Sequence, residues 1–424
     1  MTVWAVSGAA GYGKTYRLLQ RMAEELQAQP LASGQSILSL TFMHGARQRL
    51  EQKLRTVPGL RGKYECMTVD GFARSIRSRW QSMASAIGQP PTDEVDFDAQ
   101  CSLSADLVER PTVGEWLRIG YPLVVLDEAQ DLDPHRLRLI KALASCVRLL
   151  IAFDDFQCLR QELRPSPVSG WLPSVCEPEV LHKPQRTKVS ALLDAAAALR
   201  CGMAPRQGTG FKIAECAGAN QAAALIASKL HFANLAPGPN SLAVITPSRS
   251  QGYAAGLVER VSTTACGTKR LGPFRIHWES GESPFLDAVK SLEYGNSKPP
   301  SEVLALLREM EECNAQESLI RWVIRQRDMA GRGWFDHEHL LSQTRRILAT
   351  QRARTYRPEN GRRALTVHQA KNREFDGVIV IWPYTVAQDD EGKRRLLYNA
   401  ITRAKHWCVV VVQGTGSTLK SPFR

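Results

Sequence analysis

The stretch Gly8-Ala9-Ala10-Gly11-Tyr12-Gly13-Lys14-Thr15 lies near the start of this 424-residue chain and decides how the rest is interpreted. Glycines let backbone N–H groups approach phosphate oxygens, the lysine reaches the same oxygens, and the threonine hydroxyl can bind Mg²⁺. An apolar run, Val3–Val6, precedes the stretch, and an amphipathic run, Thr15–Gln27, follows it. This order points the positive end of a helix at an anion, so the sequence predicts a phosphate loop that binds a nucleotide.

Short apolar runs alternate with longer amphipathic stretches, such as Ala46–Arg55 and Pro134–Ala144, through most of the chain. The runs expected in a first sheet are Val3–Val6, Ile37–Leu40, Met67–Val69, Leu123–Leu126 and Leu149–Ala152. Those expected in a second sheet are Glu179–Leu181, Phe211–Ala214, Leu242–Thr246, Ala364–Val367, Gly377–Trp382 and Cys408–Val412. This alternation predicts an α/β protein with parallel sheets flanked by helices.

Two segments interrupt the alternation. Residues 81–118 contain Gly88-Gln89-Pro90-Pro91 and several acids, and we expect a loop-rich excursion there. Residues 262–362 contain three candidate helices, Glu302–Met310, Glu317–Gln326 and His339–Arg352. We therefore predict a first lobe at 1–175, a second lobe at 176–261 and 363–424, and a small helical insertion at 262–362.

The charge of the chain favours a polyanionic partner. Lysine and arginine exceed aspartate and glutamate by 55 to 42, which gives a net charge of +13 and a pI near 9.4. Each phosphate that such a surface neutralises releases counterions, although a basic composition can equally serve solubility. Seven arginines just before the last motifs are candidates for contact with phosphates or for a solvated face: Arg345, Arg346, Arg352, Arg354, Arg357, Arg362 and Arg363.

Composition also bounds the cellular location. No apolar run approaches the roughly 20 residues that span a bilayer, so we expect no membrane partner. Met1–Val6 has no basic region before an apolar stretch and is expected to form a strand, not a signal peptide. The 10 cysteines include no C-x-x-C pair, which argues against a zinc site and favours a reducing cytoplasm.

Two adjacent carboxylates form the second half of the expected site. Asp127 and Glu128 follow the apolar run Leu123–Leu126, and ligands of α/β sheets bind where strands end. Asp127 can hold Mg²⁺ through water, and Glu128 can orient and deprotonate an attacking water. The alternative is an acidic cap of a strand-to-loop junction, which the nearby phosphate loop makes the weaker interpretation.

The segment Asp127-Glu128-Ala129-Gln130-Asp131 resembles the second motif of UvrD/Rep-type superfamily-1 helicases. Other motifs of that family have counterparts in the same order: Leu40–Ala46, Thr68–Ala73, Asp154–Gln157, Leu181–Thr187, Leu365–Asp376 and Arg394–Lys405. The resemblance covers residues 8–405. It implies two RecA-like lobes with a nucleotide between them.

The resemblance also implies roles for single residues, with ATP (or another nucleoside triphosphate) and Mg²⁺ as cofactors. Lys14 and the other residues of 8–15 would hold phosphates. Thr15 and Asp127 would hold Mg²⁺, and Glu374 would contact the ribose. Glu128 would activate water, Gln157 would sense the γ-phosphate, and Arg186 and Arg403 would stabilise the transition state. Contact with single-stranded DNA would come from Thr41, Phe42, Thr68, Thr366 and His368.

Several positions depart from the family pattern. A glutamine motif that reads adenine has no counterpart before Gly8, and Gln185 stands where the family has a tyrosine that stacks on the base. We therefore expect looser nucleotide selectivity than the family norm. Cys158 follows Gln157 where the family places an aromatic that stacks on DNA. The aromatic residues that could substitute are Phe42, Phe72 and Trp171, each also a candidate for the core.

The sequence thus predicts an ATP-driven DNA translocase or helicase that moves 3′ to 5′ on single-stranded or partly duplex DNA. A second hypothesis is a nucleotide-gated subunit that regulates a protein partner, such as a nuclease, without processive unwinding. The loss of aromatic residues that would stack on DNA favours this second hypothesis. The presence of every residue expected for nucleotide hydrolysis favours the first. A small-molecule kinase would leave Arg186 and Arg403 without a role.

Overall fold

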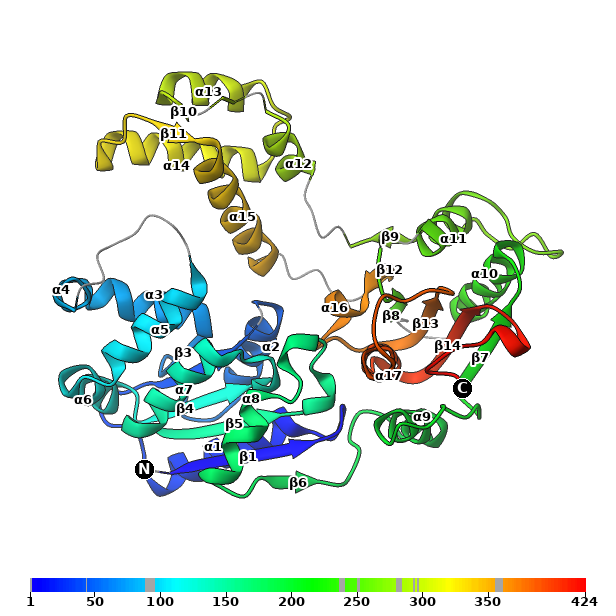
Figure 1. Cartoon of the computed structure of the whole chain (residues 1–424), viewed down its shortest axis with the longest axis horizontal. Coiled ribbons are helices and arrows are strands. Elements are labelled where there is room, and N and C mark those ends of the chain that lie inside the picture. Colours follow the sequence, from blue (N-terminus) through cyan, green and yellow to red (C-terminus); the bar gives the residue numbers. More distant parts are fainter. Residues whose placement is uncertain are drawn as a thin grey trace. The chain divides into compact units, whose positions relative to one another are not determined.

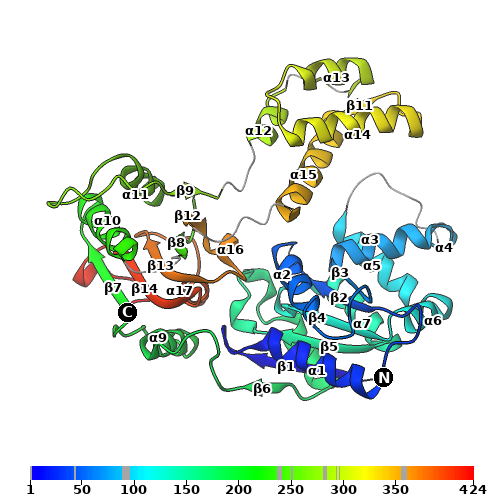
Figure 2. The same ribbon diagram turned by 180° about the vertical axis from the view of Figure 1, so that it is seen from behind.

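The computed structural model describes residues 2–42, 44–87, 96–235, 241–249, 252–279, 284–292, 294–295, 297–354 and 361–424. The chain forms two compact units, Met1–His277 with Glu359–Arg424, and Trp278–Pro358. The first unit contains two six-stranded sheets, and the second is mainly helical (Figure 1 and Figure 2). No helix among these residues is both long and apolar enough to cross a membrane.

Six parallel strands form the first sheet, in the order β3-β2-β4-β5-β1-β6. Their bounds are β1 Val3–Gly8, β2 Ile37–Thr41, β3 Tyr64–Thr68, β4 Leu123–Asp127, β5 Arg148–Phe153 and β6 Glu179–Leu181. The first five match the predicted apolar runs, so the predicted strands of this sheet are confirmed. Because the strands are parallel, their carboxyl ends meet at one edge, where α/β sheets bind ligands.

Helices cover both faces of the first sheet. One face carries α1 Lys14–Ala28 and α2 His44–Leu54, whose Leu18 and Leu50 pack with Val125 of β4. The other face carries α3 Val69–Arg79, α4 Gln81–Ala86, α5 Phe97–Val108, α6 Pro111–Gly120 and α7 Pro134–Cys146. Val124, the neighbour of Val125, points to this second face because successive strand residues alternate in direction. This sheet with its helices is the first lobe.

The loop-rich excursion predicted at 81–118 is wrong for the described residues, which are mostly helical. Asp96 caps α5, since its carboxylate accepts hydrogen bonds from the backbone N–H groups of Asp98 and Ala99. Pro111 occupies the first turn of α6, where a missing N–H costs nothing. Of the acids taken as loop signals, Asp96 and Asp98 therefore mark the start of a helix. The other loop signals fall within residues 88–95, which lie outside the described residues.

The assignment of Glu179–Leu181 to the second sheet is also wrong. This short strand, β6, pairs in parallel with Val6–Gly8 at the edge of the first sheet. The carboxylate of Glu179 accepts a hydrogen bond from Arg17 Nε of α1 at 2.7 Å. A three-residue run contains no periodicity that distinguishes two sheets, and here contacts with the first lobe determine the pairing.

The second lobe is built on a sheet with the order β7-β14-β13-β8-β12-β9. Its strands are β7 Phe211–Cys216, β8 Ser241–Thr246, β9 His277–Trp278, β12 Gly361–Thr366, β13 Phe375–Trp382 and β14 Ala404–Gln413. Strands β7, β14, β13, β8 and β12 pair in parallel. One face is covered by α9 Ser190–Arg200 and α17 Asp390–Ile401. The helices α10 Ala219–Leu235 and α11 Gly252–Thr263 complete this lobe (Figure 1). The two sheets make the chain an α/β protein with two RecA-like lobes.

The unit Trp278–Pro358 has a hydrophobic core of its own. Its helices are α12 Pro284–Lys290, α13 Pro300–Arg308, α14 Asn314–Ala330 and α15 His337–Arg354. A short antiparallel pair, β10 Ser297–Lys298 with β11 Phe335–Asp336, joins them. All three helices predicted in this region are present, while the domain boundaries predicted from the sequence stay predictions.

Candidate active site

The phosphate loop joins β1, which ends at Gly8, to α1, which begins at Lys14. Gly11 and Gly13 have positive φ angles of 81° and 84°, a conformation that favours glycine. A Cβ atom on Gly11 would lie 2.8 Å from Cβ of Arg186, so this glycine also allows a close approach. The backbone N–H groups of Gln185 and Arg186 donate to the carbonyl of Gly11 at 2.8 and 3.0 Å, which fixes the start of the second lobe on this loop.

Lys14 and Thr15 turn towards acidic groups of the first lobe. The Nζ atom of Lys14 donates to the carbonyls of Gly8 and Ala9 at 3.0 and 3.2 Å and lies 3.7 Å from the Asp154 carboxylate. The hydroxyl of Thr15 donates to Asp127 at 2.9 Å. The phosphate loop and the Asp127 carboxylate at the end of β4 are therefore in direct contact, and their roles stay predictions.

The two adjacent carboxylates differ in their surroundings. Asp127 ends β4 and is buried, and desolvation together with the charge of Glu128 raises its pKa to about 6. Glu128 has a left-handed backbone, with φ 61° and ψ 43°, which is uncommon outside glycine. Its carboxylate accepts a hydrogen bond from the side chain of Gln130 at 2.5 Å. The strained backbone turns Glu128 out of the line of β4, while Asp127 stays against Thr15.

The donors of this site fit a nucleotide with a divalent cation. A hydroxyl and a carboxylate 2.9 Å apart, Thr15 with Asp127, supply the hard oxygen ligands that Mg²⁺ takes. A bound cation would also offset the charge repulsion that raises the pKa of Asp127. The glycines of the loop and the start of α1 supply backbone N–H groups for phosphates.

Arg186 and Glu374 of the second lobe form an ion pair beside the phosphate loop. The Nε atom of Arg186 donates to Glu374 at 2.8 Å, and its Nη1 atom donates to the carbonyl of Thr402 at 2.8 Å. Desolvation acts to raise the pKa of Glu374, but Arg186, Lys405 and Arg403 outweigh it and lower that pKa. Glu374 is thus held ionised among three cations.

Arg403 is fully buried at the end of α17, with 1% of its surface exposed. Its guanidinium donates to the carbonyl of Asn399 at 2.9 Å and to the hydroxyl of Thr402 at 3.1 Å. Desolvation lowers the pKa of Arg403 to about 9; the charge of Arg186 adds to this effect and Glu128 opposes it. Glu128 of the first lobe is thus among the charges that act on this second-lobe arginine.

Further ion pairs and hydrogen bonds join the two lobes. The ammonium of Lys371 lies 2.5 and 2.6 Å from the two carboxylate oxygens of Asp131, and both side chains are buried. Arg395 of α17 donates to the backbone carbonyl of Asp155. Sequence reasoning missed these links, since nothing in the sequence pairs residues that lie 240 positions apart.

The predicted DNA-contacting residues lie at strand ends. Thr41 ends β2, Thr68 ends β3 and Thr366 ends β12. Thr68 and Thr366 cap the helices that follow, with their hydroxyls accepting from the N–H groups of Gly71 and Gln369. Local structure therefore already explains two of these threonines, and their contact with DNA stays a prediction.

Within the predicted DNA-contacting set, Thr41 and Thr68 are buried, Phe42 and Thr366 are half-buried, and His368 is exposed. The Phe42 ring is half-buried, and the guanidinium carbons of Arg136 and Arg160 lie 5.8 and 5.0 Å from its centroid. His368 is exposed on α16 (Val367–Ala370); desolvation, then the charge of Lys371, lowers its pKa. Arg136 is buried, and its guanidinium is paired with Asp70, Asp98 and Asp133, so contact of Phe42 and His368 with DNA stays a prediction.

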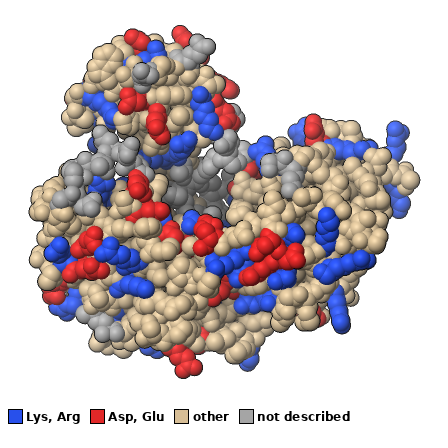
Figure 3. All heavy atoms as spheres, in the orientation of Figure 1, with Lys and Arg blue, Asp and Glu red and all other residues tan. Residues whose placement is uncertain are grey.

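Of the other two aromatic candidates, Phe72 is 1% exposed in the first core, so of its two alternatives, core or platform, the structure supports the core. Trp171 packs against the same core. The arginine cluster is divided between elements: Arg345 and Arg346 are exposed on α15, whereas Arg362 lies on β12 over the ring of Phe274. The side chains of Arg352, Arg354 and Arg357 lie outside the described residues. On the face drawn in Figure 3, basic and acidic side chains lie interspersed.

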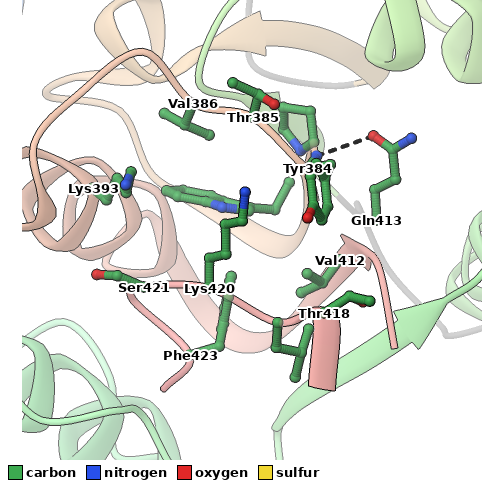
Figure 4. A pocket seen from close by; sticks show the side chains of 13 residues that line it. Tyr384, Thr385, Val386, Lys393, Val412, Gln413, Thr418, Lys420, Ser421 and Phe423 are labelled. Atoms are coloured by element: carbon green, nitrogen blue, oxygen red, sulfur yellow. Dashed lines mark hydrogen bonds between the residues drawn. The ribbon is translucent and has the colours of Figure 1, made fainter. Parts of the chain in front are cut away.

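Two cavities accompany the site. One, of about 270 Å³, borders the phosphate loop residues 9–12 and is also lined by Arg186 and Arg200 and by apolar residues of α9. The other, of about 90 Å³, lies where β13 and β14 end (Figure 4). There the ammonium of Lys420 lies 4.2 Å from the Tyr384 ring centroid, and the Tyr384 N–H donates to Gln413. Only the first cavity touches predicted site residues.

Two family models match the chain. A UvrD-like helicase C-terminal domain matches residues 362–411, and an AAA domain matches residues 1–161. Together with the motifs, these two matches support the resemblance of the chain to UvrD/Rep-type superfamily-1 helicases. No curated protein matches the chain.

The chain is also similar to solved structures of a viral helicase. The crystal structure of arterivirus nonstructural protein 10 (helicase) has 12% identity and a TM-score of 0.39, and the match covers 98% of this chain and 61% of that one. The complex of that helicase with DNA has 11% identity, a TM-score of 0.38 and coverages of 98% and 62%. The chain therefore spans about three fifths of the length of these relatives.

Proposed function

We propose that this chain is an ATP-hydrolysing motor that moves 3′ to 5′ along single-stranded DNA and separates duplex DNA. The observation that carries this proposal is that the second lobe contacts the phosphate loop directly, through the backbone N–H groups of Gln185 and Arg186 on the Gly11 carbonyl. The first lobe contributes the phosphate loop and the carboxylates Asp127 and Glu128, and the second contributes Arg186 and Arg403. A nucleotide that contacts both halves makes their separation depend on hydrolysis, which is what a translocating motor needs.

The first lobe would bind the nucleotide and activate water. Lys14 and the loop N–H groups would hold phosphates, and Thr15 with Asp127 would hold Mg²⁺. The bound Mg²⁺ would neutralise phosphate charge. Glu128 is the candidate base because its carboxylate extends from a left-handed turn beside Asp127 and is held by Gln130.

The second lobe would stabilise the charge that develops during phosphoryl transfer. Arg186 lies directly against the phosphate loop, with its backbone N–H on the Gly11 carbonyl. Arg403 is desolvated, so its charge acts in a medium of low dielectric where electrostatic stabilisation is strong. Gln157 is buried between these elements, and its carbonyl accepts a hydrogen bond from Asn399 of α17 at 3.5 Å.

DNA binding is supported by charge and by the sheet edges. The net charge of +13 favours a polyanion. The neighbouring strands β2 and β3 of the first sheet end at Thr41 and Thr68, and Phe42 follows Thr41. In the second sheet, β12 ends at Thr366. Carboxyl edges are where α/β sheets bind ligands, and the half-buried ring of Phe42 would supply a platform for a base. The direction of movement rests on the family resemblance.

A second candidate function is a nucleotide-gated subunit that regulates a protein partner such as a nuclease. The observation that favours it is the loss of stacking positions: Phe72 is in the core and Cys158 is buried where the family has an aromatic. Low affinity for DNA together with a complete set of hydrolytic residues fits a subunit that hydrolysis switches between two states better than a processive motor.

The test is ATP hydrolysis measured alone and with single-stranded DNA, single-stranded RNA or duplex DNA. The motor proposal expects stimulation by single-stranded DNA that Lys14→Ala abolishes, together with displacement of a labelled strand from a duplex with a 3′ overhang. Hydrolysis that no nucleic acid stimulates would favour the gated subunit. A wild-type protein without any hydrolysis in all four conditions contradicts both.

A further inference from the structure

The hydroxyl of Tyr398 lies against the phosphate loop although its residue belongs to the second lobe. Tyr398 is on α17 and is fully buried, with its ring edge-to-face on Phe156 at 5.0 Å between centroids. Its hydroxyl oxygen accepts a hydrogen bond from the backbone N–H of Ala10 at 2.7 Å. Ala10 is the third residue of the phosphate loop, so one amide of the loop is bound by a side chain of the other lobe.

The same hydroxyl is joined to the acidic partner of Lys14. It donates to Asp154 Oδ2 at 3.1 Å, and Arg200 Nη1 of α9 donates to it at 3.1 Å. Arg200 also donates to Asp154 Oδ1 at 2.7 Å. The Asp154 side chain is completely buried and lies 3.7 Å from Lys14. Two residues of the second lobe thus enclose a carboxylate that faces the phosphate-binding lysine.

This cluster extends to the candidate base. The backbone N–H of Asp154 donates to the side-chain oxygen of Gln130 at 3.0 Å, and the amide nitrogen of Gln130 donates to Glu128 at 2.5 Å. Gln130 is fully buried. The contacts therefore run without a break from Tyr398 and Arg200 of the second lobe, through Asp154 and Gln130, to Glu128.

We propose that Tyr398 is a positioning residue whose hydroxyl competes with phosphate oxygens for the Ala10 amide, so that nucleotide binding and release of α17 from the phosphate loop are linked. The inference rests on the proposed function, because it concerns the same nucleotide. Phosphate loops bind phosphates through their backbone N–H groups. An oxygen that already accepts from one of these groups opposes phosphate at that point.

The linkage has a definite sign. Any phosphate that takes the Ala10 amide must break the bond to Tyr398, and any phosphate that takes Lys14 must separate it from Asp154. The hydrogen bond between Tyr398 and Ala10 therefore lowers the affinity for nucleotide. By thermodynamic reciprocity, bound nucleotide weakens this hydrogen bond by the same free energy. Arg200 acts in the opposite sense, because it neutralises Asp154 and so leaves Lys14 available for phosphate.

The experiment measures the affinity of full-length variants for a fluorescent non-hydrolysable ATP analogue. Tyr398→Phe removes the hydroxyl and keeps the ring on Phe156. We expect it to bind the analogue roughly 2- to 10-fold more tightly than wild type, the range that corresponds to one hydrogen bond. The matched control is Tyr294→Phe, which removes another buried tyrosine hydroxyl, one that donates to the carbonyl of Phe335 at 2.9 Å in the helical unit. This control should leave analogue affinity unchanged.

Arg200→Gln separates competition from general loosening of the lobes. We expect it to weaken analogue binding by about 3- to 30-fold, because Asp154 is left with less positive charge beside the phosphates. If each substitution only loosened the contact between the lobes, Tyr398→Phe and Arg200→Gln would change the affinity for the analogue in the same direction. That result would overturn the proposal. If Tyr398→Phe folds poorly by its melting temperature, Tyr398→Met removes the same hydroxyl, and the same tightening is expected of it.

Failure of the inference can be told from failure of the proposed function. Lys14→Ala in the same assay should lose analogue binding. If wild type binds the analogue, Lys14→Ala does not, and Tyr398→Phe binds no more tightly than wild type, the inference is wrong and the proposed function stands. If wild type does not bind the analogue at all, the proposed function fails and the inference fails with it.

Discussion

The nucleotide cleft and the predicted DNA-contacting edge differ in how firmly the structure already holds their side chains. In the cleft, Lys14, Asp127 and Arg403 are buried, and each is bonded to partners of its own lobe. At the edge, the hydroxyls of Thr68 and Thr366 serve as helix caps, the Phe42 ring is half-buried and His368 is exposed. The first region is a preorganised site, and the second is a surface with few specific contacts.

This difference has a physical reason. Catalysis needs charges fixed in a desolvated place before the substrate arrives, because reorganisation during reaction costs rate. Binding a nucleic acid of any sequence needs only charge and stacking, which tolerate varied partners. Changes in the cleft should therefore alter turnover by orders of magnitude, and changes at the edge should alter affinity by smaller factors.

The largest effect is expected from Lys14→Ala and Glu128→Gln, both of which should stop steady-state hydrolysis. Lys14→Ala should also lose nucleotide binding, since the phosphates lose their charge partner. Glu128→Gln should keep nucleotide binding, because only the acceptor of the water proton is removed. Turnover of Glu128→Gln near the wild-type rate would show that Glu128 is not the base.

Arg403→Ala should lower turnover by about 10³-fold or more while nucleotide affinity falls much less, because a buried finger acts mainly on the transition state. A surface arginine would change turnover by less than about twofold, the outcome that contradicts the two-lobe mechanism. The pKa of Arg403, lowered to about 9, adds a pH test. The guanidinium is charged below that pKa, so turnover should fall as pH rises through about 9, with nucleotide affinity measured over the same range as the control.

The same shift has a consequence for stability. Between the folded pKa of about 9 and the ordinary value of 12.5, the unfolded chain binds more protons at Arg403 than the folded chain does. The contribution of this group to the free energy of unfolding therefore rises with pH in that window and is least favourable below it. At neutral pH the buried charge of Arg403 therefore opposes folding. Such a cost in stability is common where a site is organised for catalysis.

A smaller effect is expected at the edge from Phe42→Ala. Affinity for single-stranded DNA should fall by about 1–3 kcal/mol, because a base loses its platform. Hydrolysis without DNA should stay at the wild-type rate, since Phe42 lies outside the cleft contacts. Phe232→Ala, which removes an aromatic that is 61% exposed on α10, is the matched control and should leave DNA affinity unchanged. Equal affinities for wild type and Phe42→Ala would remove Phe42 from the proposed DNA path.

The parts of the fold that the sequence predicts are those with a strong local signal. The strands β1 to β5 and the phosphate loop follow from apolar runs and glycine spacing. The helices within 81–118 were missed because acids and prolines occur both in loops and at helix starts, and only packing decides between them. The edge strand β6 was placed in the wrong sheet because three residues do not specify a partner.

The candidate site shows the same division. Motif residues such as Lys14, Asp127 and Arg403 are predictable because the chemistry requires those side chains at those spacings. The residues that contact these motif residues cannot be predicted in the same way. Arg200, for example, has no distinguishing sequence pattern, and only the fold places it beside Asp154. The link between Lys371 and Asp131 likewise depends on how two lobes meet, which no local pattern contains.

The smallest effect is expected in the choice of nucleotide. The position at which the family stacks a tyrosine on the base is Gln185, whose backbone is fixed on the Gly11 carbonyl. Tyr16 follows Thr15 in the first turn of α1, and because its ring is 72% exposed it is a candidate to stack on the base. A ring stacks on every base, so it adds affinity without selectivity. We therefore expect kcat/KM for ATP and GTP to differ by less than about tenfold, which corresponds to about 1.4 kcal/mol. A preference of 100-fold or more would mean that a polar group reads the adenine edge. Gln185 is then the first candidate, and Gln185→Ala should remove the preference while hydrolysis of GTP stays unchanged.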